Sequence, residues 1–115
     1  MLVVDDDPQC RRLTLRLLGE LGYESTYEAA SAVEALLMLP RVQPGIVLTD
    51  IAMEQESSGL VVVEQVRALG IPVGLISGIA AYADDPLLAR LPRVLKEELT
   101  LESLAALIST LQADG

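Results

Sequence analysis

Apolar residues in this chain fall into two patterns, short continuous runs and longer stretches with helical spacing. Continuous runs are typical of strands in a parallel sheet whose two faces are both covered by helices. Such runs occur at residues 2–4, 46–48, 71–76 and 94–95. A more polar stretch, residues 24–28, predicts a further strand at the edge of the sheet. The pattern therefore predicts five strands.

Helical spacing of apolar residues follows each of these strands. Typical end signals limit the helices. Pro8 after Asp7 begins the first and Gly22 ends it, and Ser31 begins a second helix that Pro40 is expected to end. The helices are expected at about residues 8–21, 32–39, 59–69, 86–91 and 101–111. Asp84-Asp85-Pro86 begins the fourth of them, and Pro92 must keep it short.

Strict alternation of strands and helices predicts an α/β fold, with a five-stranded parallel sheet and five helices on both faces. With no linker or internal repeat, residues 1–115 are expected to form a single domain. In the strand order 2-1-3-4-5, the order in which strands are added to the sheet reverses between the first and third strands. Open sheets of this kind bind ligands at such a reversal.

Composition narrows the classes of function. The formal net charge of −9 argues against direct binding of nucleic acid, which requires a basic face. No apolar run is long enough for a membrane span, and the N-terminus does not resemble a signal peptide. The single cysteine, Cys10, excludes an internal disulfide and fits a reducing compartment, so a cytoplasmic location is expected.

Polar residues that could take part in binding or catalysis follow four of the predicted strands. Asp5 and Asp6 follow the first, Asp50 the third, Ser77 the fourth and Lys96 the fifth. Parallel strands bring all of these ends to one edge of the sheet. Crowded carboxylates repel one another unless a cation intervenes, and all-oxygen ligands suit Mg²⁺. A carboxylate can also attack phosphorus, with an ammonium balancing the negative charge of the phosphoryl group and a hydroxyl donating a hydrogen bond to it.

These motifs together resemble the receiver domain of a bacterial two-component response regulator, over essentially the whole chain. The motifs are Val3-Val4-Asp5-Asp6, Leu48–Met53, Gly59, Leu75-Ile76-Ser77-Gly78 and Val94-Leu95-Lys96. The resemblance implies a flavodoxin-like fold and phosphoryl transfer from a histidine kinase or phosphotransfer protein to Asp50. It also implies a signalling domain, not an enzyme, that switches contacts with a downstream protein or effector domain. A homodimer is compatible with such a role.

The same resemblance implies a role for each residue of the site. Asp50 would be the phosphoacceptor, and Ser77 and Lys96 would bind the phosphoryl group. Mg²⁺ would be held by Asp5, Asp6, Asp50 and the backbone carbonyl of Ala52. Asp7 lies beyond the acidic pair and is expected to cap a helix.

Some positions depart from the family pattern. Met53-Glu54 replaces a usual Met-Pro, and Arg93 stands where an aromatic residue is usual. Glu97 replaces a proline that usually follows the lysine in a cis bond. A trans bond is therefore expected here, with Lys96 aimed differently.

Two alternative functions stay open. A receiver-like pseudo-domain would act by protein binding without phosphorylation. A haloacid-dehalogenase-like phosphatase would use Asp5-x-Asp7 as its nucleophile motif, although it leaves Asp50 without a role.

Overall fold

The computed structural model describes residues 1–50, 58–78 and 89–114. Within them, five parallel strands form one sheet in the order β2-β1-β3-β4-β5. The strands are β1 (Leu2–Val4), β2 (Tyr27–Ala29), β3 (Val47–Thr49), β4 (Val73–Ser77) and β5 (Arg93–Leu95). The predicted strand order is confirmed.

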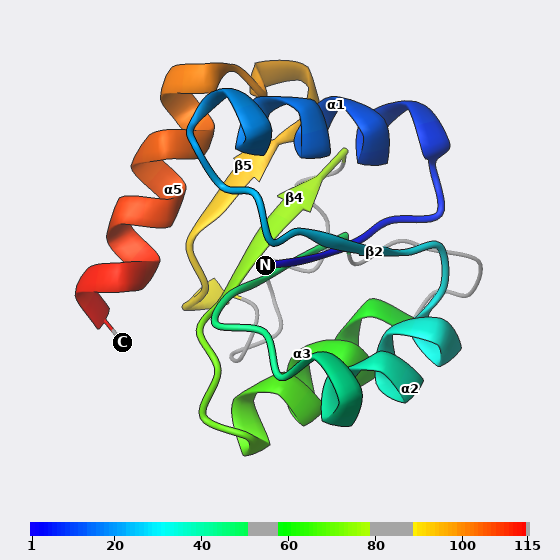
Figure 1. Cartoon of the computed structure of the whole chain (residues 1–115). Helices are drawn as coiled ribbons and strands as arrows, with labels where there is room; N and C mark the ends of the chain where they lie inside the picture. Colours follow the sequence, from blue (N-terminus) through cyan, green and yellow to red (C-terminus); the bar gives the residue numbers. More distant parts are fainter. Residues whose placement is uncertain (51–57, 79–88, 115) are drawn as a thin grey trace.

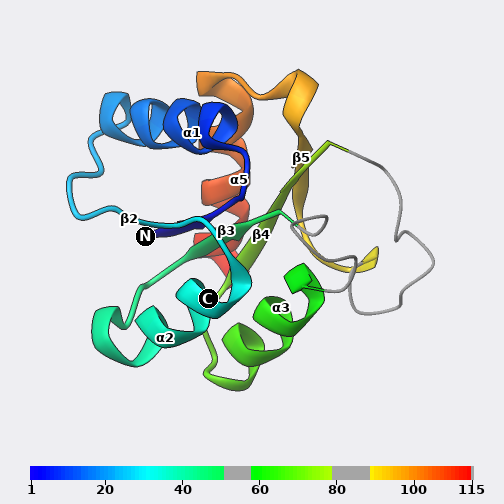
Figure 2. The ribbon, with the colours of Figure 1, turned by 90° about the vertical axis from the view of Figure 1, so that its right-hand side faces the viewer.

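Helices cover both faces of this sheet (Figures 1 and 2). One face carries α1 (Pro8–Glu20) and α5 (Leu101–Asp114), and the other carries α2 (Ala32–Val42) and α3 (Ser58–Ala68). A short 3₁₀ helix, η1 (Lys96–Glu98), follows β5 directly. The first half of the expected fourth helix, residues 86–88, and the Asp84-Asp85 pair before it lie outside the described residues. No helix in the described ranges is long and apolar enough to cross a membrane.

The interior consists of two clusters of buried side chains, one on each side of the sheet. Successive strand residues enter opposite clusters, as the two-residue period of a strand requires. Leu2 and Val4 join the cluster that also holds residues of α2 and α3, whereas Val3 joins the cluster of α1 and α5. A Cβ at Gly74 would stand 2.9 Å from Leu111, so a glycine in β4 lets α5 pack closely.

Most helix ends lie where the sequence predicts them. The Asp7 side chain accepts a hydrogen bond from the backbone N–H of Gln9 and caps the N-terminus of α1. Gly22, just beyond the C-terminal end of α1, has a φ of +96°. The Ser31 hydroxyl accepts from the N–H of Glu34 and caps α2. Asp7 is therefore a cap, as predicted.

Two predictions about helix extent are wrong. Pro40 does not end α2, which continues to Val42 and stops at Gln43 in a left-handed conformation. Proline removes only its own N–H, and the Gln43 N–H still reaches the Leu39 carbonyl at 3.0 Å. The third helix, expected to reach residue 69, ends at Ala68, and Leu69 beyond it is 58% exposed.

Candidate functional site

The carboxyl ends of β1, β3, β4 and β5 meet at one edge of the sheet. Val4 is level with Thr49, and Ser77 is level with Leu95, so the residues that follow each strand are neighbours. Backbone bonds extend this alignment past the strands. The Asp50 N–H donates to the Val4 carbonyl at 2.9 Å, and the Asp5 N–H donates to the Ala29 carbonyl at 3.1 Å. Asp5 and Asp50 are therefore held in place by their own backbone.

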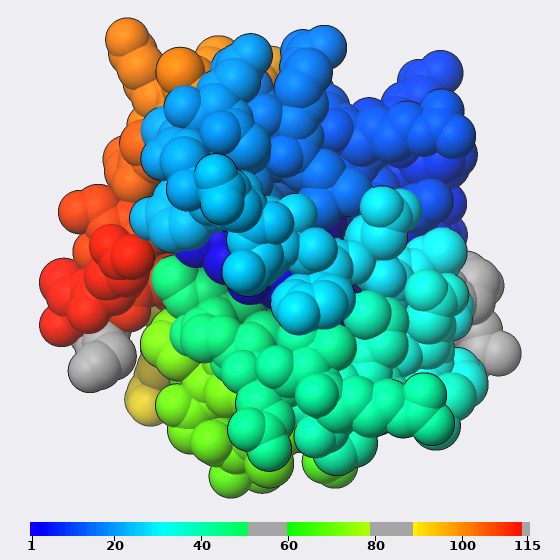
Figure 3. Space-filling model, viewed as in Figure 1, coloured from blue at the N-terminus to red at the C-terminus, as the bar shows by residue number. Residues whose placement is uncertain are grey.

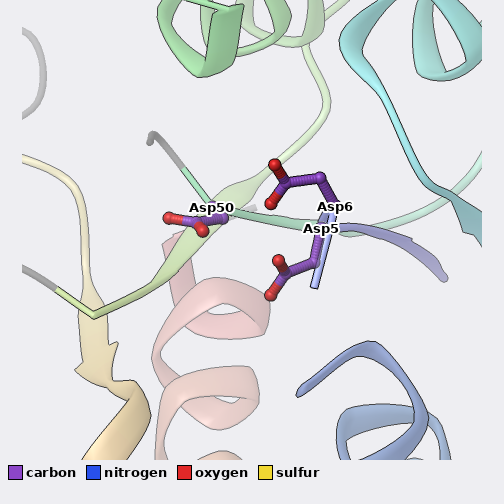
Figure 4. Close-up of side chains that lie close together, drawn as sticks. All are labelled: Asp5, Asp6 and Asp50. Carbon is purple, nitrogen blue, oxygen red and sulfur yellow. The ribbon is translucent and has the colours of Figure 1, made fainter. Parts of the chain in front are cut away.

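Three carboxylates gather at this edge (Figure 4). Asp5, Asp6 and Asp50 each offer an oxygen, and these oxygens lie within 4.8 Å of one another. Asp5 and Asp50 are only 4% and 3% exposed, whereas Asp6 is exposed. The donor set consists of oxygens alone and Asp6 is exposed to solvent, which fits a hard divalent cation such as Mg²⁺ that retains some of its waters.

Lys96 joins two of these carboxylates. Its Nζ lies 2.9 Å from Asp50 Oδ2 and 3.1 Å from Asp5 Oδ2. Burial alone would lower the pKa of this ammonium, but hydrogen bonds to Asp50 and Asp5 outweigh burial and raise the pKa above its ordinary value of 10.5. Lys96 is therefore charged at neutral pH, and the cluster still carries an excess of negative charge.

The expected change in the direction of Lys96 is a wrong prediction. The described residues contain no cis peptide bond, so the bond to Glu97 is trans as expected. Even so, η1 begins at Lys96 and turns the following glutamates outward, where both are exposed. The lysine side chain keeps its direction toward Asp5 and Asp50 without the usual proline.

Ser77 completes the part of the site that the structure describes. It is the last residue of β4 and is 6% exposed. The structure thus brings five of the predicted site residues to one sheet edge. They are Asp5, Asp6, Asp50, Ser77 and Lys96. Ala52, predicted to offer its carbonyl, lies outside the described residues, as does Met53-Glu54.

The fold alone does not identify the protein family, but comparison with known families does. Residues 1–98 match the family described as response regulator receiver domain. This chain belongs to that family. The resemblance predicted from the strand-end motifs is thereby confirmed.

Individual relatives of this receiver domain differ widely in length. Over 83 residues it is 39% identical to the sensor histidine kinase RcsC of Escherichia coli, covering 72% of this chain and 8% of RcsC. Over 69 residues it is 41% identical to the chemotaxis protein CheY1 of Helicobacter pylori, covering 59% of this chain and 55% of CheY1. The chain thus spans a small part of the first relative and about half of the second.

A solved structure agrees with the fold. The response regulator TrrA of Thermotoga maritima, in complex with Mg²⁺-BeF, superposes with a TM-score of 0.82 at 28% identity. The match covers 96% of each chain.

Arg11 is a residue of this receiver domain whose role the sequence did not predict. Its side chain is only 14% exposed. One guanidinium nitrogen donates to the Asp5 carbonyl at 2.7 Å, and another pairs with Glu28 Oε1 at 2.9 Å. Arg11 thus ties α1 and β2 to the backbone of the acidic turn. The sequence does contain a signal for this contact, since Arg11 follows the Asp7 cap by four residues and so lies about one helical turn from the acidic turn.

Cys10 lies beneath the acidic site and is expected to react slowly. Burial, followed by the nearby Asp5 carboxylate, raises the pKa of its thiol from 9.0 to about 11. A shift of two pH units leaves about 100-fold less thiolate near pH 8. We expect labelling by a disulfide reagent at pH 8 to be about 100-fold or more slower in native protein than in urea.

The same pKa shift predicts a pH dependence of stability. The folded state holds the Cys10 proton more tightly than the unfolded state does. The contribution of the protonated thiol to the stability of the folded state is therefore complete below pH 9.0 and is lost as the pH rises toward about 11.

For the labelling experiment, equal rates in native and unfolded protein would contradict the described burial of Cys10.

Proposed function

We propose that this chain is the phosphoacceptor domain of a two-component system, in which Asp50 receives a phosphoryl group in an Mg²⁺-dependent transfer. The observation that carries the proposal is the position of Asp50. Asp50 follows the central strand β3 directly and is 3% exposed, and its carboxylate lies 2.9 Å from the Lys96 ammonium and clusters with Asp5 and Asp6.

The chemistry follows from these neighbours. One carboxylate oxygen of Asp50 forms a bond to phosphorus while the P–N bond of the donor's phosphohistidine breaks. The imidazole keeps the bonding electron pair and takes up a proton from solvent. Lys96 stabilises negative charge on the transferring group, and Ser77 offers a hydroxyl hydrogen bond from the neighbouring strand end. Transfer of this kind depends mainly on alignment and charge balance.

Asp5, Asp6 and Asp50, with the Ala52 carbonyl, are the groups we propose to hold Mg²⁺. When bound, the cation neutralises charge between the carboxylates and the incoming phosphoryl group. The clustering of three carboxylates beside the Lys96 ammonium supports this assignment, because a divalent cation would balance the remaining negative charge.

The remaining assignments concern the protein as a whole. We propose that residues 1–115 form one receiver domain that takes phosphate from a histidine kinase or phosphotransfer protein. It passes the signal to a downstream protein or effector domain and turns over no substrate of its own. A cytoplasmic location fits the free thiol of Cys10.

Intact mass measurement tests the phosphoacceptor function. The protein is incubated with acetyl phosphate, with and without Mg²⁺, and gain of one phosphoryl group only when Mg²⁺ is present is expected. Calorimetry should detect Mg²⁺ binding that Asp5→Asn weakens. No adduct at saturating donor, together with no Mg²⁺ binding, would instead support the pseudo-domain.

The phosphatase alternative is separated by the same preparation. It requires Asp7 in a nucleophile motif, but Asp7 caps α1 through the Gln9 N–H at 3.0 Å. We expect no sustained release of phosphate from a chromogenic phosphate ester. Steady turnover that Asp5→Asn abolishes and Asp50→Asn leaves intact would overturn the proposed function.

Gly78→Leu is expected to slow phosphorylation roughly 10-fold or more. A Cβ at Gly78 would already be in van der Waals contact with Lys96 Cδ at 3.6 Å, so the larger leucine side chain occupies space beside the lysine stem, and small displacements of catalytic groups are costly. Gly45→Leu is the matched control, since nothing lies within 4 Å of a Cβ there. Labelling followed by mass against time should separate the two variants. Equal rates would show that Gly78 is dispensable.

A further inference from the structure

Exposed apolar side chains gather on the helices α2 and α3. Among the described residues, four of the six exposed large hydrophobic side chains belong to α2, α3 or the turn after α3. They are Val33 (66% exposed), Leu37 (66%), Val61 (43%) and Leu69 (58%). The blue-green surface of α2 and the segment after it forms much of the lower half of the face in Figure 3. We call α2, α3 and Leu69 the α2–α3 patch.

A groove runs between the two helices of this patch. Its volume is about 750 Å³, and its walls include Leu36 and Pro40 from α2, Val61 from α3 and Leu69 beyond it. A concave apolar surface flanked by exposed apolar side chains is typical of a protein contact.

The charge of the patch differs from that of the chain. The sequence of α2 contains one acid and one base, Glu34 and Arg41, and α3 likewise contains Glu64 and Arg67. The whole chain carries a formal charge of −9. Two copies of a chain this acidic repel each other in most relative orientations. The repulsion is absent when the α2 and α3 helices of one copy face those of the other, because each of these helices has balanced charges.

Glu34 and Arg41 are also arranged for pairing with themselves. They are seven residues apart, which is about two turns or about 10 Å along one helix face. Leu37 lies between them on that face, and all three side chains are exposed. Within the described part of the chain neither charge has an ion-pair partner.

We propose that this domain forms a homodimer through the α2–α3 patch, with two antiparallel copies of α2 related by a two-fold axis near Leu37. The axis places each Glu34 beside Arg41 of the second copy, so the same ion pair forms twice. Contact between identical surfaces is the usual geometry of a two-fold dimer.

The size of this contact and the exposure of its ion pairs indicate a weak dimer. A standard interface buries about 800 Å² on each partner, which requires the groove and α3 in addition to α2. Half-exposed ion pairs add specificity more than affinity. A dissociation constant on the order of 10 µM is expected.

Sedimentation equilibrium of the unphosphorylated chain tests the proposal. The average mass should rise from monomer toward dimer between about 1 and 200 µM. Leu37→Glu should leave only monomer, and Leu101→Glu, which changes an exposed leucine on α5, should not. Thermal melting checks that both variants fold. No phosphodonor is present, so failure here leaves the assignment of Asp50 intact.

Charge reversal identifies the partner surface. Glu34→Arg and Arg41→Glu should each weaken the dimer about tenfold or more. A mixture of the two variants should restore it, since in the mixed dimer one copy has arginine at both positions and the other has glutamate at both. A chain that stays monomeric at about 200 µM, or a dimer indifferent to Leu37→Glu, would overturn the proposal. So would a mixture no better than its components.

Discussion

Asp50→Asn is expected to reduce phosphoryl labelling to background while the fold stays intact. The amide has nearly the shape of the carboxylate but lacks its charge and is a poor nucleophile toward phosphorus. Because Asp50 lies at the end of β3 with its N–H bound to the Val4 carbonyl at 2.9 Å, the substitution leaves the backbone bond in place. The measurement is intact mass after saturating acetyl phosphate with Mg²⁺, with a thermal melt of each variant.

Asp7→Asn is the matched control for this loss. Asp7 lies two residues from Asp5 but caps α1, and asparagine caps a helix about as well as aspartate. Labelling of this variant should equal that of the wild type. If Asp50→Asn still gained a phosphoryl group, the acceptor would be another residue and the proposed mechanism would be wrong.

Lys96→Met should destabilise the metal-free protein by about 2–3 kcal/mol. Removing one partner of a fully buried ion pair costs about 3–5 kcal/mol, and a lower value applies because the Lys96 side chain is 22% exposed. The substitution leaves the buried Asp5 and Asp50 carboxylates facing each other without an ammonium. Urea unfolding in the presence of a chelator measures the change.

Adding Mg²⁺ should recover part of this loss, since a cation in the cluster balances the same carboxylates. The gain on adding Mg²⁺ should be larger in Lys96→Met than in the wild type. Arg16→Met removes an exposed charge from α1 and should alter neither stability nor the response to Mg²⁺ by more than about 0.5 kcal/mol. A Lys96→Met protein as stable as the wild type in chelator would contradict the role of Lys96 in the site.

The candidate site was predictable from the sequence because its residues lie at the ends of strands or directly after them. A buried parallel strand has a continuous apolar signal, so the residue after it is located to within one position. Asp50 and Lys96 were placed together in this way although they lie far apart in the chain. No local pattern reports which atom a long side chain reaches, and so the bond from Arg11 to the Asp5 carbonyl was not predicted.

Two predictions that rested on the conformational preference of a single residue failed for a related reason. Pro40 and Glu97 were interpreted by their own conformational preferences. In the structure, the Gln43 N–H bond maintains the last turn of α2, and η1 maintains the direction of Lys96. Contacts made by neighbouring residues outweighed the preference of one residue in both cases.

The division of the interior by the sheet has a consequence for how this domain can vary. Leu18 of α1 and Val66 of α3 are both fully buried but belong to different clusters. Substitutions in separate environments usually have additive effects on stability. The packing on each side of the sheet can therefore change over generations without waiting for a compensating change on the other. A lineage can remodel the surface of α2 and α3 for a new partner while α1 and α5 retain their inherited packing.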